Sequence, residues 1–150
     1  VGTLQARKVE SWIRETPSSS MRVAQYKIDY MKDNGQLVVF SGIGGSPDEN
    51  IERWYKQFKS ESNLPIDETS LKWEIAKDKF KIKFVHFEGT FMKSDMRMNS
   101  VTEELKGYAL LAAIISGANE PYYFKMTGPS SLIKSQKKVF ESFIKSIDEL

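Results

Sequence analysis

The stretch LVVFSGIGGSPDENIERWYKQF, residues 37–58, decides how this chain folds. It starts as an apolar strand, turns at a cluster of glycines and continues as a helix. Ser46 is a suitable N-cap, Pro47 suits the first helical position, and Glu49 completes a capping box with Ser46. Apolar residues then recur at helical spacing, so we expect the helix to pack on the sheet that contains the strand. These apolar residues are Ile51, Trp54, Tyr55 and Phe58.

A strand, a glycine loop and a helix also form the phosphate cradle of many nucleotide-binding proteins. The dinucleotide fingerprint needs a third glycine at the position of Pro47, and a Walker loop needs a lysine followed by Ser or Thr at the helix start. Asp48 and Glu49 instead place two carboxylates where a phosphate would sit. The stretch therefore predicts a sharp turn from sheet to helix and no nucleotide site.

Three β-hairpins and a second helix account for most of the remaining chain. The hairpins are predicted over residues 21–43, 70–91 and 108–127, where apolar or alternating runs flank turn residues. The second helix starts at Ser130. Its predicted inner face comprises Leu132, Gln136, Val139, Phe140, Phe143 and Ile147. This order predicts an α+β fold, an antiparallel β-sheet built of hairpins with helices packed on its faces.

Three segments lack a regular pattern. Residues 1–10 are predicted to form an extended N-terminal arm, with Trp12 and Ile13 as the first anchors on the domain. Residues 60–70 are predicted to be a loop, and residues 93–106 a polar, irregular segment.

The composition fits one domain spanning residues 1–150, long enough to bury roughly two thirds of its unfolded surface. Twenty-two Lys and Arg stand against twenty Asp and Glu, so the net charge of +2 gives no general electrostatic reason to bind nucleic acid. The chain has no cysteine, which excludes disulfides and thiolate metal sites within it. The longest apolar run, near residues 108–115, is far shorter than the roughly 18 residues of a membrane span.

The densest group of potential hydrogen-bonding side chains lies near Trp12. Ser20, Arg22 and Gln25 are candidates for a ligand or partner site, with Arg22 as the charge-pairing group and the serine and glutamine orienting the ligand. A serine turn that leads into an edge strand explains the same residues, so both interpretations stay open.

Methionines gather in the irregular segment, at Met92, Met96 and Met98. Methionine side chains adapt their shape to apolar ligands and partners, which makes these three residues further candidates for a binding surface. A loop that covers the sheet with its methionines is the alternative interpretation.

His86 is the single histidine, and Glu88 follows it on the same face of a predicted strand. The pair suggests a small hydrolase or isomerase in which Glu88 orients His86. No obvious nucleophile accompanies the pair, and a structural histidine is the simpler interpretation. No metal or cofactor motif is present, so none is predicted.

Lys79, Lys81 and Lys83 alternate with apolar residues in another part of the same strand. A basic stripe beside aromatic residues can bind nucleic acid. The solvated side of an amphipathic strand explains the lysines better, so no nucleic-acid partner is predicted.

Four segments resemble a known group of proteins. They are PSSSMRVAQY (17–26), ENIERWYKQF (49–58), FEGTF (87–91) and PYYFKMTGP (121–129). In this order they are similar to small, mostly uncharacterised bacterial proteins, many of them predicted lipoproteins. The layout of that group resembles the PsbP-like α/β/α sandwich, the fold of an extrinsic subunit of photosystem II.

The resemblance runs from Trp12 to Ile147, and it implies a fold and export more than a function. It implies a non-enzymatic binding or accessory module of the bacterial cell envelope, periplasmic or anchored by a lipid, with an envelope protein as partner. The chain has no lipobox cysteine, so a lipid anchor would have to lie before Val1. No functional residue is carried over from the group.

Overall fold

The computed structural model describes residues 4–5, 8–77, 79–95, 100–117 and 120–149. The strands are β1 (Leu4–Gln5), β2 (Trp12–Glu15), β3 (Arg22–Tyr30), β4 (Asp33–Ser41), β5 (Phe58–Lys59), β6 (Leu71–Lys77), β7 (Phe80–Asp95), β8 (Ser100–Ser116), β9 (Tyr122–Pro129) and β10 (Asp148–Glu149). The helices are α1 (Pro47–Tyr55), α2 (Ile66–Thr69) and α3 (Ser130–Lys145).

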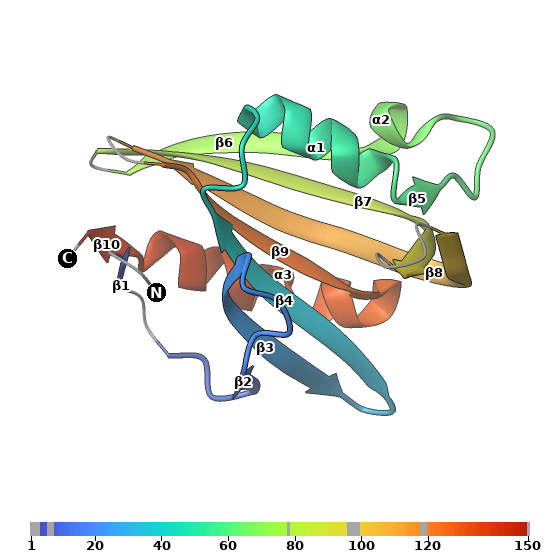
Figure 1. Ribbon diagram of the computed structural model, residues 1–150, viewed down its shortest axis with the longest axis horizontal. Helices are drawn as coiled ribbons and strands as arrows, with labels where there is room; N and C mark the ends of the chain where they lie inside the picture. The colour runs from blue at the N-terminus through green and yellow to red at the C-terminus, as the bar shows by residue number, and fades with distance from the viewer. Residues whose placement is uncertain (1–3, 6–7, 78, 96–99, 118–119, 150) are drawn as a thin grey trace.

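Within these residues, eight strands form one antiparallel sheet in the order β2-β3-β4-β9-β8-β7-β5, and β6 also pairs with β7 (Figure 1). The predicted hairpins appear as the neighbouring pairs β3–β4, β6–β7 and β8–β9. The short strands β1 and β10 pair with each other beside the two chain ends. The α+β prediction of a sheet built from hairpins is confirmed.

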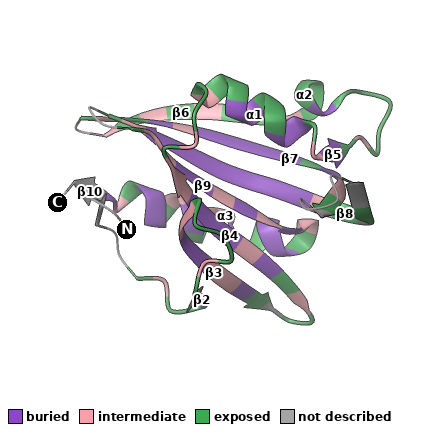
Figure 2. Ribbon diagram, viewed as in Figure 1, coloured by how far each residue is buried: buried purple, intermediate pink, exposed green. Residues whose placement is uncertain are grey.

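Helices cover both faces of the sheet. The face toward α1 and α2 buries a cluster that includes Ile51, Trp54 and Phe87, whereas the face toward α3 buries a second cluster around Phe84 and Phe140. Figure 2 shows that the central strands are buried along most of their length. The sandwich of helix, sheet and helix implied by the resemblance is therefore observed.

The glycine loop turns the chain from β4 into α1 as predicted. Gly42, Gly44 and Gly45 all have positive φ angles, between 66° and 76°. Other residues rarely adopt this backbone conformation. Ser46 accepts a hydrogen bond from the Glu49 amide at 3.1 Å, as an N-cap should.

Asn50 then ties the loop to the sheet. Its side-chain amide donates to the carbonyl of Gly44 at 3.1 Å and to the hydroxyl of Tyr123 in β9 at 3.1 Å. Asn50 is buried, so these bonds satisfy donors that water cannot reach. They fix where α1 begins above the sheet.

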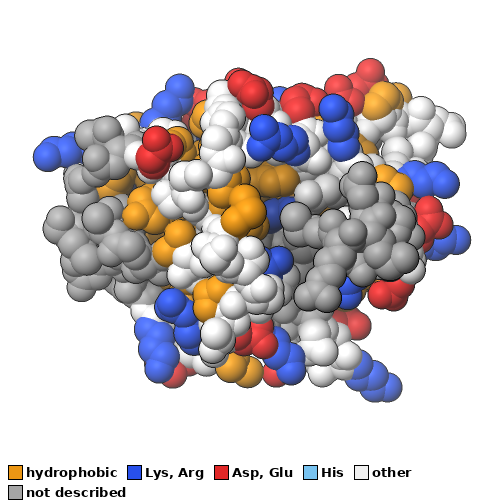
Figure 3. Space-filling model, viewed as in Figure 1, with side chains coloured by type: hydrophobic (Ala, Val, Ile, Leu, Met, Phe, Trp, Pro, Cys, Tyr) orange, Lys and Arg blue, Asp and Glu red, His pale blue; other side chains and the backbone are white. Residues whose placement is uncertain are grey.

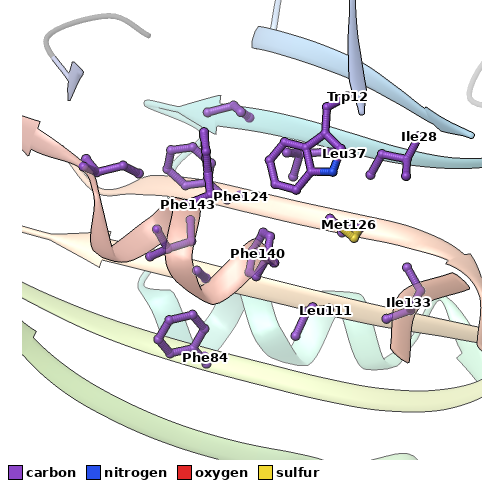
Figure 4. Packing of buried hydrophobic residues seen from close by; sticks show 14 of the residues in the cluster. Trp12, Ile28, Leu37, Phe84, Leu111, Phe124, Met126, Ile133, Phe140 and Phe143 are labelled. Carbon is purple, nitrogen blue, oxygen red and sulfur yellow. The ribbon is translucent and has the colours of Figure 1, made fainter. Parts of the chain in front are cut away.

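On the opposite face, Trp12 packs over α3 (Figure 4). Its ring meets that of Phe143 edge-on with 5.0 Å between centroids, and its indole N–H donates to Gln136 Oε1 at 3.0 Å. The hydrogen bond satisfies a buried donor and joins β2 to the last helix. Trp12 is the anchor that the sequence predicted.

Four local predictions are wrong. Residues 93–95 and 100–106 are not irregular, because β7 continues to Asp95 and β8 starts at Ser100. Residues 60–70 contain α2. Ile13 is 49% exposed and Val139 is 39% exposed, so neither is an inner residue. In α3, Ile133 and Ile144 complete the buried face instead.

The bond between Trp12 and Gln136 can be tested with a double-mutant cycle. Removing one partner leaves a buried polar group unsatisfied, so we expect Trp12→Phe and Gln136→Leu each to cost about 1–3 kcal/mol in urea unfolding. The double variant should cost less than the two together, because it leaves no orphaned group. Strictly additive losses would show that this bond does not couple β2 to α3.

Candidate functional site

The face of the sheet toward α1 is only partly covered by helices. Helices α1 and α2 lie over β7, β8 and β9, and the cluster beneath them also takes in Phe40 near the end of β4 (Figure 1). Register places Gln25 of β3, Val38 of β4 and Lys125 of β9 side by side on this face. Lys125 therefore lies where the cover provided by α1 ends.

We call Arg22, Gln25, Trp54, Gln57 and Lys125 the Lys125 cluster. The ammonium of Lys125 donates to Gln57 Oε1 at 2.6 Å and lies 5.7 Å from the centroid of the Trp54 ring. The backbone holds Gln57 in place, since its amide donates to the Trp54 carbonyl at 3.1 Å. Its carbonyl accepts from the Met92 amide of β7 at 2.8 Å. The end of α1 thus positions the amide that faces Lys125.

The pKa of Lys125 is lowered from 10.5 to about 8. Burial is the larger cause, and the positive charge of Arg22 is the smaller one. Burial disfavours the charged form of an amine, and a neighbouring cation acts in the same direction. Among the described residues, neither Lys125 nor Arg22 has a carboxylate within ion-pair distance. The charge of Arg22 thus acts on Lys125, and no described carboxylate pairs with either cation.

Arg22 and Gln25, both predicted site residues, come together in the structure. The Arg22 guanidinium donates to Gln25 Oε1 at 2.8 Å, and that oxygen also accepts from the Ser18 amide at 3.1 Å. Gln25 Nε2 donates to Glu15 Oε1 at 3.1 Å. Gln25 is only 7% exposed, and both the oxygen and the nitrogen of its side-chain amide form hydrogen bonds. These bonds fix Gln25, which in turn positions the guanidinium of Arg22.

The structure places Ser20 and Trp12 outside the Lys125 cluster. Ser20 is exposed in the turn before β3. Trp12 projects to the α3 side, on the face opposite Gln25, and takes no part in the cluster. Partial burial lowers the pKa of the Arg22 guanidinium, which remains a cation at neutral pH.

The predicted methionine surface is described only in part. Met92 is half-buried and supplies the backbone amide that anchors Gln57. Met96 and Met98 lie outside the described residues, so a ligand surface made of methionines stays a prediction.

His86 lines a cavity of about 290 Å³ at the edge of the sheet. Ser60, Glu61 and Thr69 contribute polar groups to the same cavity. The pKa of His86 is lowered, first by burial and then by Lys137, and its Nε2 atom has no hydrogen-bond partner among the described residues.

Glu88 does not hydrogen-bond His86. Its carboxylate pairs with Lys134 of α3 at 3.2 Å. A general base is oriented by a partner and lies within reach of the group it deprotonates. The described residues supply no such partner for His86 Nε2, and this favours a buried structural histidine.

The stripe of Lys79, Lys81 and Lys83 meets nearby carboxylates. Lys83 contacts Asp48 of α1 at 2.8 Å, and Lys81 contacts Glu74 of β6 at 3.5 Å. The hydrogen bond between Lys83 and Asp48 raises the pKa of the amine and lowers that of the acid. The two lysines that have these partners offer less charge to a nucleic acid.

Sequence reasoning missed Lys125, Gln57 and Trp54 as parts of a site. One signal was present, because Lys125 interrupts the run PYYFKMT, in which neighbouring strand residues are apolar. Its alternation with Tyr123 places the amine on the inner face under α1. The contact between Lys125 and Gln57 depends on where α1 ends above the sheet. The sequence PYYFKMT carries no information about that position.

Comparison with solved structures finds the same fold in the solution structure of cyanobacterial PsbP (CyanoP) from Synechocystis sp. PCC 6803. The TM-score is 0.55 and the sequence identity 10%, over 100% of this chain and 94% of that chain. The chain therefore has a PsbP-like fold, as the resemblance implied. No protein-family model and no curated protein sequence matches it. At this identity the likeness concerns the fold alone.

None of the helices in the described part of the chain has the length and apolar character needed to cross a membrane.

The charge of Lys125 can be tested through the stability of the protein. A pKa lowered from 10.5 to about 8 means that protonation of Lys125 is less favourable in the folded protein than in the unfolded chain, by about 3 kcal/mol. We therefore expect Lys125→Met to raise the free energy of unfolding at pH 7 by roughly 1–3 kcal/mol, measured by urea unfolding. The stability of the unaltered protein should rise relative to the variant between about pH 8 and 10.5, because only the unfolded chain still binds the proton there.

Lys138 is the matched control, since it is exposed on α3. Lys138→Met should leave stability nearly unchanged and should show no such dependence on pH. A Lys125→Met protein that is less stable than the unaltered protein at pH 7 would contradict the inference that the buried cation at position 125 lowers stability.

His86 makes a separate prediction about acid. Its pKa is lowered from 6.5, so below about pH 6.5 the unfolded chain binds a proton more readily than the folded protein does. Stability should fall as the pH falls through this range, and His86→Leu should remove that part of the loss. Because the chain has one histidine, the difference between the two pH profiles isolates this residue. Parallel profiles would show that His86 is not held neutral by its surroundings.

Proposed function

We propose that this protein is a non-enzymatic binding module that recognises an acidic group with Lys125 and Arg22. The observation that carries the proposal is the pair of partly buried cations with no carboxylate partner among the described residues. Natural proteins rarely keep buried charges unpaired, because each must be separated from water. An anion bound between the two side chains would offset this cost.

The chemistry of the cluster suits a carboxylate or a phosphate. A guanidinium presents several N–H donors in one plane and can bind two oxygens of an anion at once, and an ammonium adds a point charge. Gln25 holds the guanidinium at 2.8 Å, and Gln57 holds the ammonium at 2.6 Å. Both cations are therefore oriented before a ligand arrives, which reduces the entropy lost on binding.

We further propose that the acidic group belongs to a protein of the bacterial cell envelope, to which this module is an accessory. The PsbP-like fold and the resemblance to exported bacterial proteins support this proposal. The side chains of the cluster come from β3, β9, α1 and Gln57, which follows α1, so the binding surface would lie beside α1 on this face of the sheet.

The experiment is a comparative pull-down from envelope extract, with mass spectrometry as the readout. The baits are the unaltered protein, Arg22→Gln, Lys125→Met and Lys27→Gln. We expect a protein that the unaltered bait retains and that both cluster variants lose by about tenfold or more, the scale of one lost charged hydrogen bond. Direct titration with the purified partner then measures the change in Kd.

Lys27→Gln is the matched control. Lys27 lies on β3, on the same face as Gln25, but it already pairs with Asp29 at 3.5 Å. Its replacement changes the net charge as much as either cluster variant does, and it should retain the partner. Equal capture by all four baits, or no capture by folded baits, would refute the proposed role of Lys125 and Arg22.

A further inference from the structure

Strand β6 leaves one edge of the large sheet open. It pairs with β7 on one side, and no described strand pairs with its other side. The register between β6 and β7 runs from Leu71 to Lys77 without a bulge. The strands β2 and β5, which also lie at margins of this sheet, have only four and two residues. Within the described residues, β6 is therefore the longest open edge of the large sheet.

An open edge presents backbone N–H and C=O groups with which another strand can pair. Proteins commonly protect such an edge with a proline, a bulge or charged side chains. The sequence of β6, LKWEIAK, has no proline, and its pairing with β7 has no bulge. The positions of its charged side chains therefore decide whether a second strand can bind.

The side chains of β6 divide between the two faces of the sheet. Lys72 and Glu74 lie on the face toward α1, because Lys72 opposes Val85 of the cluster beneath that helix. The apolar side chains lie on the face toward α3, and they are Leu71, Trp73 and Ile75. Leu71 is 55% exposed, and the other two are only partly buried. The strand thus has a charged face and an apolar face that its own chain does not fully cover.

Lys72 and Glu74 are accessible to a second chain. Among the described residues, Lys72 has no carboxylate within ion-pair distance. Glu74 pairs with Lys81 at 3.5 Å and with Lys83 at 3.7 Å, and its side chain is still 45% exposed. A groove of about 490 Å³ lies between α1 and β6, and both Lys72 and Glu74 line it. The helix therefore leaves space beside these two side chains.

Charge selects one register for the pairing of β6 with a second copy of itself. In an antiparallel pair related by a two-fold axis perpendicular to the sheet, opposite residues lie on the same face. The registers that pair most of the two strands centre on Trp73, Glu74 or Ile75. Centring on Trp73 places Lys72 of each copy opposite Glu74 of the other copy. Centring on Glu74 opposes two glutamates, and centring on Ile75 brings no opposite charges together. Because opposite charges across a sheet stabilise it and like charges destabilise it, the first register is favoured.

We propose that this protein forms a symmetric dimer in which the β6 strands of two copies pair about a two-fold axis at Trp73. The pairing gives each Lys72 a carboxylate partner and places each Leu71 opposite Ile75 of the other copy. It also satisfies the backbone groups of the open edge, and it joins the two sheets into one. An interface built on one strand from each copy is small, so we expect a Kd of about 1 μM or weaker.

The surface beside this edge does not oppose such a contact. Acidic and basic side chains are interspersed along the side of the molecule that carries α1 (Figure 3). The net charge of the chain is only +2. Two copies can therefore approach each other without the repulsion of a large field of one sign.

The symmetry of the dimer has a consequence for binding. Because the two-fold axis is perpendicular to the sheet, the faces toward α1 point the same way in both copies. Both Lys125 clusters would then lie on one face of the dimer. A partner with two acidic groups would engage both clusters, and the first contact would raise the effective concentration for the second. This consequence rests on the proposed function, whereas the dimer itself does not.

The experiment is sedimentation equilibrium of the full chain at concentrations from about 1 μM to 1 mM. We expect the mean mass to rise from 17.2 kDa toward twice that value. Lys72→Glu and Glu74→Lys each oppose like charges in both cross-strand pairs, so each should weaken dimerisation by about tenfold or more. An equimolar mixture of these two variants should restore it, because one copy then carries two acids and the other two lysines at the paired positions.

Lys138→Glu is the matched control. Lys138 is exposed on α3, outside the proposed interface, and its replacement changes the net charge as much as Lys72→Glu does. This variant should dimerise like the unaltered protein. The pairing would be overturned by an unaltered protein that stays at 17.2 kDa, by single variants that dimerise equally well, or by a mixture of the two that stays monomeric.

A second measurement needs no variant, which matters because Glu74→Lys also loses its ion pairs with Lys81 and Lys83. In amide hydrogen exchange, the outward-facing amides of β6 should exchange more slowly at high than at low protein concentration, whereas those of β2 should not change. Exchange in β6 that is independent of concentration would refute the dimer. The variants and the exchange experiment leave Arg22 and Lys125 unaltered, so the pull-down remains an independent test of the proposed function.

Discussion

Burial of β8 on both faces is the constraint on which the structure depends. Every residue from Ala109 to Ile115 is at most 2% exposed, so each face of this strand needs a covering layer. The chain provides α1 on one side and α3 on the other, and alternate residues of β8 divide between the two cores. At about 25 cal/mol for each Å² of apolar surface removed from water, burial of this strand is a main source of stability.

The two helices do not meet this need in the same way. α3 runs for sixteen residues along the sheet and is closed at its side by Trp12. α1 has nine residues, and the cluster beneath it reaches Phe40 at the end of β4. Lys125 lies at that boundary, where the apolar core under Trp54 gives way to polar side chains. The short helix therefore creates a place where a polar residue can enter an otherwise apolar face of the sheet.

Much of the fold could be predicted because its signals are local. Pro47 and the N-cap Ser46 mark the start of α1, and the alternation of Lys81, Ile82 and Lys83 reveals a strand with one buried face. The extension of β7 to Asp95 and the start of β8 at Ser100 were missed because polar residues on both faces erase that alternation. Val139 was expected inside because apolar spacing alone does not fix the rotation of a helix to within one residue.

The site was harder to predict than the fold. Arg22 and Gln25 lie three residues apart, and their density of polar groups was visible in the sequence. Lys125 follows them by a hundred residues and reaches them only through the pairing of β3 with β4 and of β4 with β9. Register between distant strands is set by the whole sheet, so no local pattern contains it.

A comparison between two lysines shows why Lys125 calls for a functional explanation. Lys83 and Lys125 project from the same face of the sheet, on β7 and β9. Asp48 compensates the charge of Lys83 and raises its pKa, whereas burial and Arg22 lower the pKa of Lys125. An apolar side chain at position 125 would extend the core under Trp54 and avoid the cost of a buried cation. A residue expected to lower stability where an apolar one would raise it is characteristic of a functional site, and this supports the proposal that Lys125 takes part in binding an acidic group.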